Sequence, residues 1–168
     1  MRIDVDYLVM GSGIAGLFFA IQAAEHGRVA VVTKRDRSES NTRYAQGGIA
    51  AVMDQADSVA RHAFDTELAG AGICRTSVVE SVIAEGPAVI AQLVKLGARF
   101  TRDAAGALSL AREGGHDAAR VVRADDMTGR EVARALVAAA EAIPNVSLLD
   151  EHMACLLYTS DAADDGLC

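Results

Sequence analysis

The sequence has 168 residues, of which 51% are hydrophobic and 4% aromatic, and its formal net charge is −7. This length suits one domain whose core is built from small and branched side chains rather than aromatic rings. The negative charge argues against a nucleic-acid partner, and no apolar run approaches the length that crosses a membrane. Because the N-terminus also lacks a signal-peptide layout, we expect a cytoplasmic protein.

The three cysteines are Cys74, Cys155 and Cys168. None stands in a CxxC motif or beside a histidine pattern, so the sequence predicts neither a disulfide framework nor a metal site. We expect Cys74 to be a small buried apolar residue.

A glycine-rich turn follows the first apolar run of the chain. Residues 7–10 have the pattern of a buried strand, the sequence Gly11-Ser-Gly-Ile-Ala-Gly16 matches GxGxxG, a helical pattern covers residues 14–26, and a second strand is expected at Val29–Val32. In such a βαβ unit the glycines allow a sharp turn and close backbone approach, and the helix N-terminus attracts phosphate. The motif alone also arises by chance, but this context favours a dinucleotide ligand.

The second strand ends without the expected acid. Nucleotide-binding units of this kind place Asp or Glu there to accept the ribose hydroxyls, whereas this chain has Thr33-Lys34 followed by a polar loop over residues 33–40. This departure argues against an ordinary NAD site. Lys34 is then available to phosphate, and Asp36 is a weaker candidate for the ribose.

Residues 41–51 change from polar to apolar around the pair Gly47-Gly48. Such a segment suits a backbone that lies against a flat ligand, and it equally suits an ordinary turn before a short strand.

Two helices are expected between residues 57 and 97. Asp57 is a candidate N-cap for the first, in which His62 is interpreted as a solvated or packing residue. The spacing Ser77 to Glu80 predicts a capping box for the second. The pattern predicts an interruption at Gly86-Pro87, a core stripe after it, and an end at Gly97.

The remaining pattern predicts a small hairpin, a polar loop, a helix and a strand. The hairpin joins residues 99–101 to residues 108–110, and it delivers the loop Arg112-Glu-Gly-Gly-His116, which suits either a polar substrate or a solvated turn. The spacing Thr128 to Glu131 predicts a capping box, and residues 146–149 predict another parallel strand. The fold class is therefore α/β, a Rossmann-like domain with a parallel sheet and a small hairpin insertion.

Taken together and in order, five motifs are more specific than the glycine turn. They are Gly11 to Gly16, Tyr44-Ala-Gln-Gly-Gly-Ile-Ala-Ala51, Ala69-Gly-Ala-Gly-Ile-Cys74, Arg112 to His116 and Thr128-Gly-Arg-Glu131. Over residues 3–153 the chain resembles the aspartate-oxidising members of the succinate dehydrogenase and fumarate reductase flavoprotein family. The resemblance implies FAD as cofactor and oxidation of L-aspartate to iminoaspartate, with oxygen or fumarate as acceptor. This reaction is the first step of NAD biosynthesis, and quinolinate synthase is the implied partner enzyme.

The resemblance also assigns roles to residues. Ser12 to Ala15 would hold the pyrophosphate, Asn41 to Gly48 would lie along the flavin and ribityl chain, and Glu113 would orient the substrate amine. Membrane-complex members carry a flavin-linked histidine where this chain has Asn41, so noncovalent FAD is expected. The full set of expected cofactor residues is Gly11, Ser12, Gly13, Ile14, Ala15, Gly16, Lys34, Asn41, Thr42, Arg43, Tyr44, Ala45, Gln46, Gly47 and Gly48.

Two other functions compete with this one. A soluble dicarboxylate dehydrogenase or fumarate reductase flavoprotein would share the motifs, and a noncatalytic nucleotide-binding module would share the glycine turn. Glu113, Asn41 and the run from Tyr44 to Ala51 favour the aspartate-oxidising members.

We expect residues 1–153 to be the N-terminal part of an FAD-binding domain. Residues 155–164 resemble the translation of a sequencing-library adapter, so residues 154–168 are expected to be a non-native tail. In the family that the chain resembles, the capping domain and the proton-transferring arginine come later in the sequence, and the fragment itself is expected to be inactive.

Overall fold

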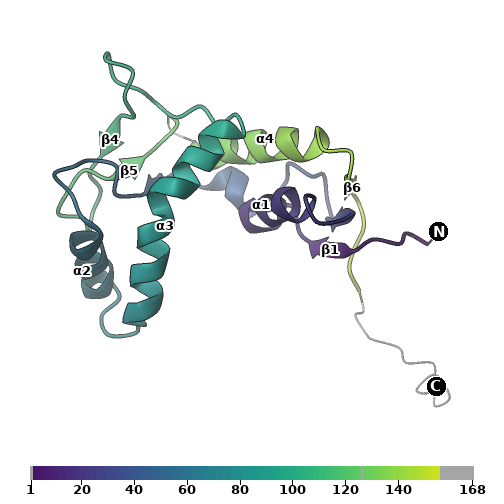
Figure 1. Cartoon of the computed structure of the whole chain (residues 1–168), viewed down its shortest axis with the longest axis horizontal. Coiled ribbons are helices and arrows are strands. Elements are labelled where there is room, and N and C mark those ends of the chain that lie inside the picture. The colour runs from purple at the N-terminus through teal and green to yellow at the C-terminus, as the bar shows by residue number, and fades with distance from the viewer. Residues whose placement is uncertain (1, 126, 156–168) are drawn as a thin grey trace.

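A computed structural model describes residues 2–125 and 127–155, and Figure 1 shows their arrangement. The expected tail falls mostly outside the described residues. In chain order the elements are β1 (Tyr7–Met10), α1 (Ile14–Ala23), β2 (Val29–Val32), the 3-10 helix η1 (Asn41–Tyr44), β3 (Ile49–Ala50), α2 (Val59–Ala69), α3 (Thr76–Lys95), β4 (Leu110–Ala111), β5 (Val121–Val122), α4 (Thr128–Glu141) and β6 (Val146–Leu149).

One of the two sheets is parallel, in the order β1-β2-β6, and joins the two N-terminal strands to the last strand of the chain. Tyr7 pairs with Val29 and Val29 with Val146, so the three strands end together at Met10, Val32 and Leu149. Helix α1 connects β1 to β2 and packs on both strands and on α4. The predicted α/β class, the glycine turn between strand and helix, and both later parallel strands are confirmed.

Strand β1 is less buried than its sequence predicts. Val9 is buried, but Leu8 and Met10 are 54% and 57% exposed. Side chains alternate between the two faces of a strand, and among the described residues only the face that carries Val9 is covered by helix α1. Helix α1 also ends at Ala23, three residues before the expected His26.

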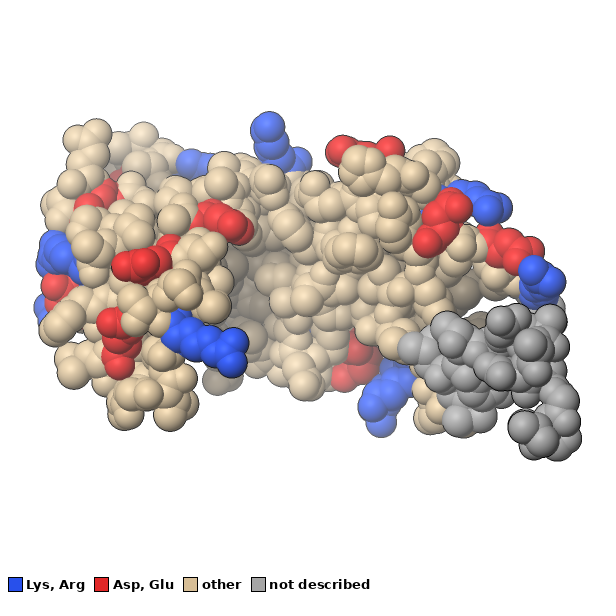
Figure 2. Space-filling view, turned by 60° about the horizontal axis from the view of Figure 1, so that its bottom comes forward, with Lys and Arg blue, Asp and Glu red and all other residues tan. Residues whose placement is uncertain are grey.

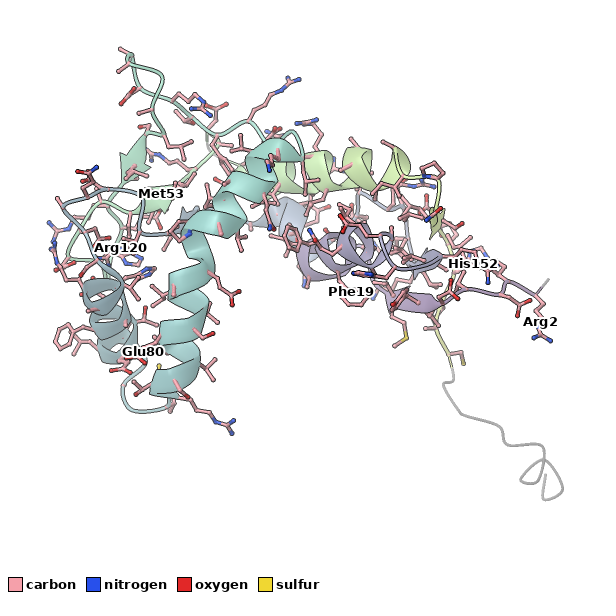
Figure 3. All side chains as sticks on the ribbon, viewed as in Figure 1. Arg2, Phe19, Met53, Glu80, Arg120 and His152 are labelled. Atoms are coloured by element: carbon pink, nitrogen blue, oxygen red, sulfur yellow. The ribbon has the colours of Figure 1, made fainter. Side chains whose placement is uncertain are left out.

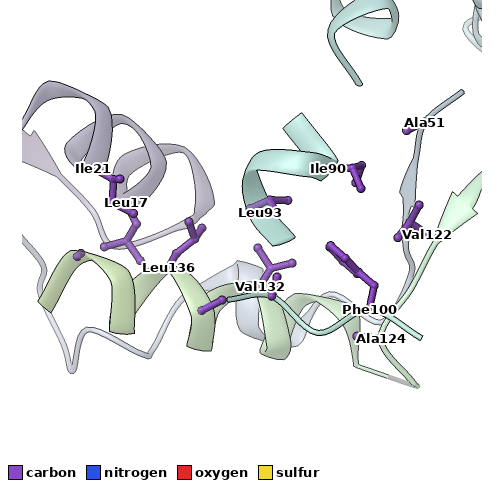
Figure 4. Close-up of a cluster of buried hydrophobic side chains, with 13 residues drawn as sticks. Leu17, Ile21, Ala51, Ile90, Leu93, Phe100, Val122, Ala124, Val132 and Leu136 are labelled. Atoms are coloured by element: carbon purple, nitrogen blue, oxygen red, sulfur yellow. The ribbon is translucent and has the colours of Figure 1, made fainter. Parts of the chain in front are cut away.

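The main core lies where α1, α3 and α4 meet a second, short sheet formed by β3, β4 and β5 (Figure 4). Leu17 and Leu136 join α1 to α4, and Ile90 and Leu93 bring the C-terminal half of α3 against Val132 and Phe100. All of these side chains are nearly or fully buried. This core holds the parallel sheet and the second sheet in one body, because helices from both halves contribute to it.

The second sheet is antiparallel, in the order β3-β5-β4. The expected hairpin forms: Arg102 and Leu108 make an antiparallel bridge, the Ser109 N–H donates to the Thr101 carbonyl, and the Asp103 N–H donates to the Ala107 carbonyl, both at 2.9 Å. Leu110–Ala111, just after it, pairs with Val121–Val122. Strand β5 is the central strand: its two valines are buried, and it pairs with β3 on one side and with β4 on the other. The sequence analysis identified neither β5 nor this pairing.

Helices α2 and α3 correct three local predictions. The N-cap of α2 is Ser58, whose Oγ accepts a hydrogen bond from the backbone N–H of Arg61 at 3.2 Å. The predicted N-cap, Asp57, accepts hydrogen bonds from Arg120 instead. Helix α3 begins at Thr76 without a side-chain cap, so the capping box at Ser77 does not form. The helix continues through Pro87, because Ile83, Ile90 and Leu93 form one buried face on both sides of the proline.

The two other predictions about helix ends had opposite outcomes. Gly97 ends α3 as predicted, with φ +92° and a hydrogen bond from the Ala98 N–H to the Leu93 carbonyl. The capping box of α4 does not form. Thr128 Oγ1 instead accepts from the Ala124 N–H at 3.0 Å, and Glu131 accepts from the Arg99 N–H at 2.8 Å.

Helix α3 also corrects the statement that no apolar run reaches membrane-spanning length. Among the described residues it is the one helix long and apolar enough by length and composition. A core helix passes the same test, so the finding does not assign a membrane to the protein.

Candidate functional site

The glycine turn after β1 depends on the absence of side chains. Gly11 has φ +105°, and its N–H donates to the Val32 carbonyl at 2.8 Å, which fixes the turn to the end of β2. A Cβ on Gly16 would overlap the Gly11 carbonyl oxygen and lie 3.2 Å from Val9 Cγ1. The first glycine therefore permits the turn, and the last permits the contact between α1 and the strand.

Thr42 connects the glycine turn to η1. Its Oγ1 accepts a hydrogen bond from the N–H of Ile14 at 3.0 Å, in the first turn of α1. Ser12 is buried and donates through Oγ to Thr33 Oγ1 at 3.2 Å. The other N–H groups of the first turn of α1 have no acceptor within the helix, so they are available to an anion.

A cavity of about 610 Å³ opens beside this turn. This volume lies within the range of roughly 300–1,000 Å³ that is typical of small-molecule sites. Of the residues expected to bind cofactor, it is lined by Gly11, Ser12, Gly13, Lys34, Asn41 and Thr42. Sequence reasoning missed Glu39, Ser40 and His152, which also line it; Figure 3 labels His152 near the end of the sheet.

Asp36 and Glu39, both in the loop after β2, have different roles. Asp36 accepts hydrogen bonds from the N–H and the Oγ of Ser38 at 2.8 and 2.6 Å, and these bonds lower its pKa. Asp36 does not line the cavity. Its carboxylate, the weaker candidate for the ribose, is bonded to Ser38 within its own turn. Glu39 lines the cavity and accepts from the Tyr44 hydroxyl at 2.7 Å. This bond raises the pKa of Tyr44.

Ser40 supplies a test of whether the cavity suits a polar ligand. Its Oγ is shielded from solvent and has no hydrogen-bond partner among the described residues. An unpaired buried hydroxyl is costly, and this one belongs to a residue that lines the cavity. A bound group with polar oxygens, such as the diphosphate and ribose of FAD, would satisfy it.

The segment after Thr42 leads from the cavity to the second sheet. The Gly129 N–H donates to the Ala45 carbonyl at 3.0 Å, which holds the segment on α4. Tyr44, Ala45, Gln46 and Gly47 are exposed. A Cβ on Gly48 would overlap the Val122 carbonyl oxygen, so this glycine allows β3 to approach β5. The structure thus contains the turn and short strand, while contact with a flat ligand stays a prediction.

Glu113 lies apart from the cavity, in the exposed loop between β4 and β5. Its carbonyl accepts from the His116 N–H at 3.2 Å, and Gly115 has φ +82° at the third position of this tight turn. The structure therefore divides the predicted site residues between two places, the glycine turn with η1 and the loop of Glu113. Strand β3, paired with β5, connects the two. Acidic and basic side chains are interspersed on the face shown in Figure 2.

Comparisons with known proteins agree with this geometry. The family model described as an FAD binding domain matches residues 6–166. A Nicotiana tabacum protein named L-aspartate oxidase 2-b, chloroplastic, is 48% identical over 97% of this chain, and an Arabidopsis thaliana L-aspartate oxidase is 49% identical over 96%. A structure of a variant of the FrdA subunit of Escherichia coli quinol fumarate reductase superposes with a TM-score of 0.86, at 31% identity and over 90% of the chain. The chain spans 25%, 24% and 26% of these three proteins, about a quarter of their length.

Proposed function

The chain belongs to the FAD binding domain family of flavoproteins, and from that premise we propose that it is part of an FAD-dependent L-aspartate oxidase. The observation that carries this proposal is the similarity, at 48% and 49% identity over nearly the whole chain, to proteins that bear this name. The proposed reaction oxidises L-aspartate to iminoaspartate, with oxygen or fumarate as electron acceptor. We place it at the first step of NAD biosynthesis in the cytoplasm, with quinolinate synthase as a partner enzyme.

In this proposal the glycine turn holds the pyrophosphate of FAD. The free N–H groups at the start of α1 and the Lys34 ammonium would face the phosphates, and Ser40 Oγ would gain a partner. Glu39 is the carboxylate available to the ribose. When bound, FAD supplies the chemistry by accepting a hydride from the substrate Cα.

The segment Asn41 to Gly48 would run along the rest of the cofactor. Its exposed stretch leads from the cavity toward the sheet that carries the Glu113 loop. A long dinucleotide lying on this stretch would reach from the glycine turn toward the Glu113 loop. An asparagine amide lacks the nucleophilic ring nitrogen of a histidine. We therefore propose that FAD is held noncovalently.

Glu113 would pair with the ammonium of aspartate. Its carboxylate is exposed at the tip of a tight turn and makes no ion pair among the described side chains. A carboxylate that meets an ammonium favours an amino acid over a plain dicarboxylate, because charge-assisted hydrogen bonds are the stronger kind.

The test is an assay of the full-length protein that contains this chain, with L-aspartate and with succinate. We expect oxygen consumption with aspartate, and an increase of about tenfold or more in the aspartate KM for Glu113→Gln. Glu85→Gln, a matched change on an exposed helix surface, should behave as wild type. Turnover of succinate alone would contradict the proposal.

That contrary result would favour a second candidate, a soluble flavoprotein of the succinate dehydrogenase or fumarate reductase type. The specific observation in its favour is the TM-score of 0.86 to a fumarate reductase subunit. A noncatalytic nucleotide-binding module is the third candidate, and a full-length protein that binds FAD without turning over either substrate would support it.

A further inference from the structure

A buried ionic centre lies under the loop that carries Glu113. Arg120, just before β5, is fully buried, and each of its five N–H groups has an acceptor. Nε and Nη2 donate to the two oxygens of Asp57 at 2.7 and 2.8 Å, and Nη1 donates to Asp65 at 2.5 Å. The remaining donors meet Asp117 Oδ1 at 2.8 Å and His116 Nδ1 at 3.3 Å.

The acceptors come from two parts of the chain. Asp57 directly precedes Ser58, the N-cap of α2, and Asp65 lies in the middle of α2. His116 and Asp117 belong to the loop between β4 and β5. Figure 3 shows Arg120 beside α2, on the side of the second sheet. By bonding to these four side chains, Arg120 fastens the loop to α2.

Further bonds strengthen the fastening around Asp117. Its N–H donates to Asp65 Oδ2 at 2.9 Å, and its second oxygen accepts from Arg61 Nη2 at 2.8 Å. The Asp117 N–H and Arg120 together lower the pKa of Asp65 to about 2. Asp65 therefore stays ionised at any pH where an oxidase would be assayed.

Arg120 also fixes the ring of His116. A guanidinium only donates, so His116 Nδ1 must accept and the ring proton lies on Nε2. The edge of this ring meets His62, with 5.5 Å between ring centroids. His62 is buried, and burial, followed by the nearby Arg120 charge, lowers its pKa. His62 thus packs, as one of the two sequence interpretations had it, and is not solvated.

The fixed ring and backbone of His116 determine where Glu113 lies. The two residues close one tight turn through the hydrogen bond from the His116 N–H to the Glu113 carbonyl, and Arg112 Nε donates to the His116 carbonyl at 3.0 Å. With one end of a four-residue turn held by an ionic centre, the position of the other end has little freedom.

We propose that the buried Arg120 centre positions Glu113 and thereby sets the preference for a substrate that carries an ammonium group. This inference rests on the proposed function, since it assigns Arg120 and Asp117 as positioning residues for that site. Neither residue needs to touch the substrate. Their effect passes through the turn to the Glu113 carboxylate.

The experiment compares Asp117→Ala with Asp117→Asn and with Glu85→Gln in the full-length protein. Asp117 is half-exposed, and its loss leaves Arg120 paired with Asp57 and Asp65, so the fold is retained. We expect the aspartate KM of Asp117→Ala to rise about tenfold, because small misplacements of a binding group are costly. The KM for fumarate, reduced with a viologen dye and lacking an ammonium, should stay within about twofold. Asp117→Asn should recover part of the loss, and Glu85→Gln should match wild type.

Two further measurements separate positioning from general damage. Combined with Glu113→Gln, Asp117→Ala should change the aspartate KM by less than about twofold, because coupled residues are not additive. Amide hydrogen exchange over residues 112–118 should accelerate in Asp117→Ala. Equal losses for aspartate and fumarate, or additivity with Glu113→Gln, would overturn the positioning role, and unchanged exchange would overturn the fastening itself. A wild type without aspartate turnover would refute the proposed function instead, and the exchange result would still decide whether the loop is fastened.

Discussion

Replacing Arg120 by methionine tests how much the buried ionic centre contributes to stability. The substitution keeps an unbranched stem, shorter than that of arginine, and removes the guanidinium with its charge. Asp57 and Asp65, with side chains 2% and 8% exposed, then lose their guanidinium partner. Asp117 keeps Arg61 and is half in solvent, so it contributes little to the loss.

Removing one partner of a buried ion pair costs about 3–5 kcal/mol, because the other charge stays buried and unpaired. For a chain of this size we expect the melting temperature to fall by roughly 6–20 °C. The matched control is Arg28→Met, which breaks an ion pair with Asp6 on the surface and should have little effect.

Urea unfolding of the chain, followed by far-UV circular dichroism at pH 7 and pH 4, measures both variants. In the wild type the pKa of Asp65 falls from 3.8 to about 2, so its contribution is present above pH 3.8 and is lost as the pH falls through 2. In Arg120→Met, burial without a partner raises the pKa values of the carboxylates, and proton uptake by the folded state stabilises the variant as the pH falls. The difference between wild type and variant should therefore be smaller at pH 4. The reasoning would be refuted if Arg120→Met lowered the free energy of unfolding by less than about 1 kcal/mol at pH 7, or lowered it more at pH 4 than at pH 7.

Three other predictions concern the cofactor site of the full-length protein. Gly16→Ala forces a Cβ onto the Gly11 carbonyl oxygen and should abolish flavin retention; full flavin absorbance at equal protein concentration would contradict this. Thr42→Val removes the acceptor of the Ile14 N–H, worth about 1 kcal/mol, and should weaken FAD binding about fivefold in a fluorescence titration, whereas Thr42→Ser should not. With Asn41 in place of a histidine, acid precipitation should release all flavin into the supernatant, and flavin left in the pellet would count against noncovalent binding.

The local patterns of the sequence were enough to predict the nucleotide-binding half of the fold. The strand Val29–Val32 and the turn from Gly11 to Gly16 were predicted correctly, because their structure follows from steric demands within a few residues. Gly97 as the end of α3 belongs to the same class. These features need no distant partner to be specified.

The tertiary structure decided the features that depend on partners far along the chain. Asp57 has the sequence of an N-cap, yet it pairs with Arg120, 63 residues away. Pro87 has the sequence of a helix break, yet the buried face of α3 carries the helix past it. Thr42 caps a helix 28 residues earlier in the sequence. No local pattern encodes such pairings.

The sequence by itself therefore determined the conformation of the glycine turn. Only the tertiary structure decided that Glu113 lies apart from that turn, on a loop that a buried arginine fastens to α2. The physical reason is the range of the interactions. Steric limits and hydrophobic periodicity act over a few residues. The acceptors of a buried guanidinium depend instead on which elements pack around it, and these can be far away in the sequence.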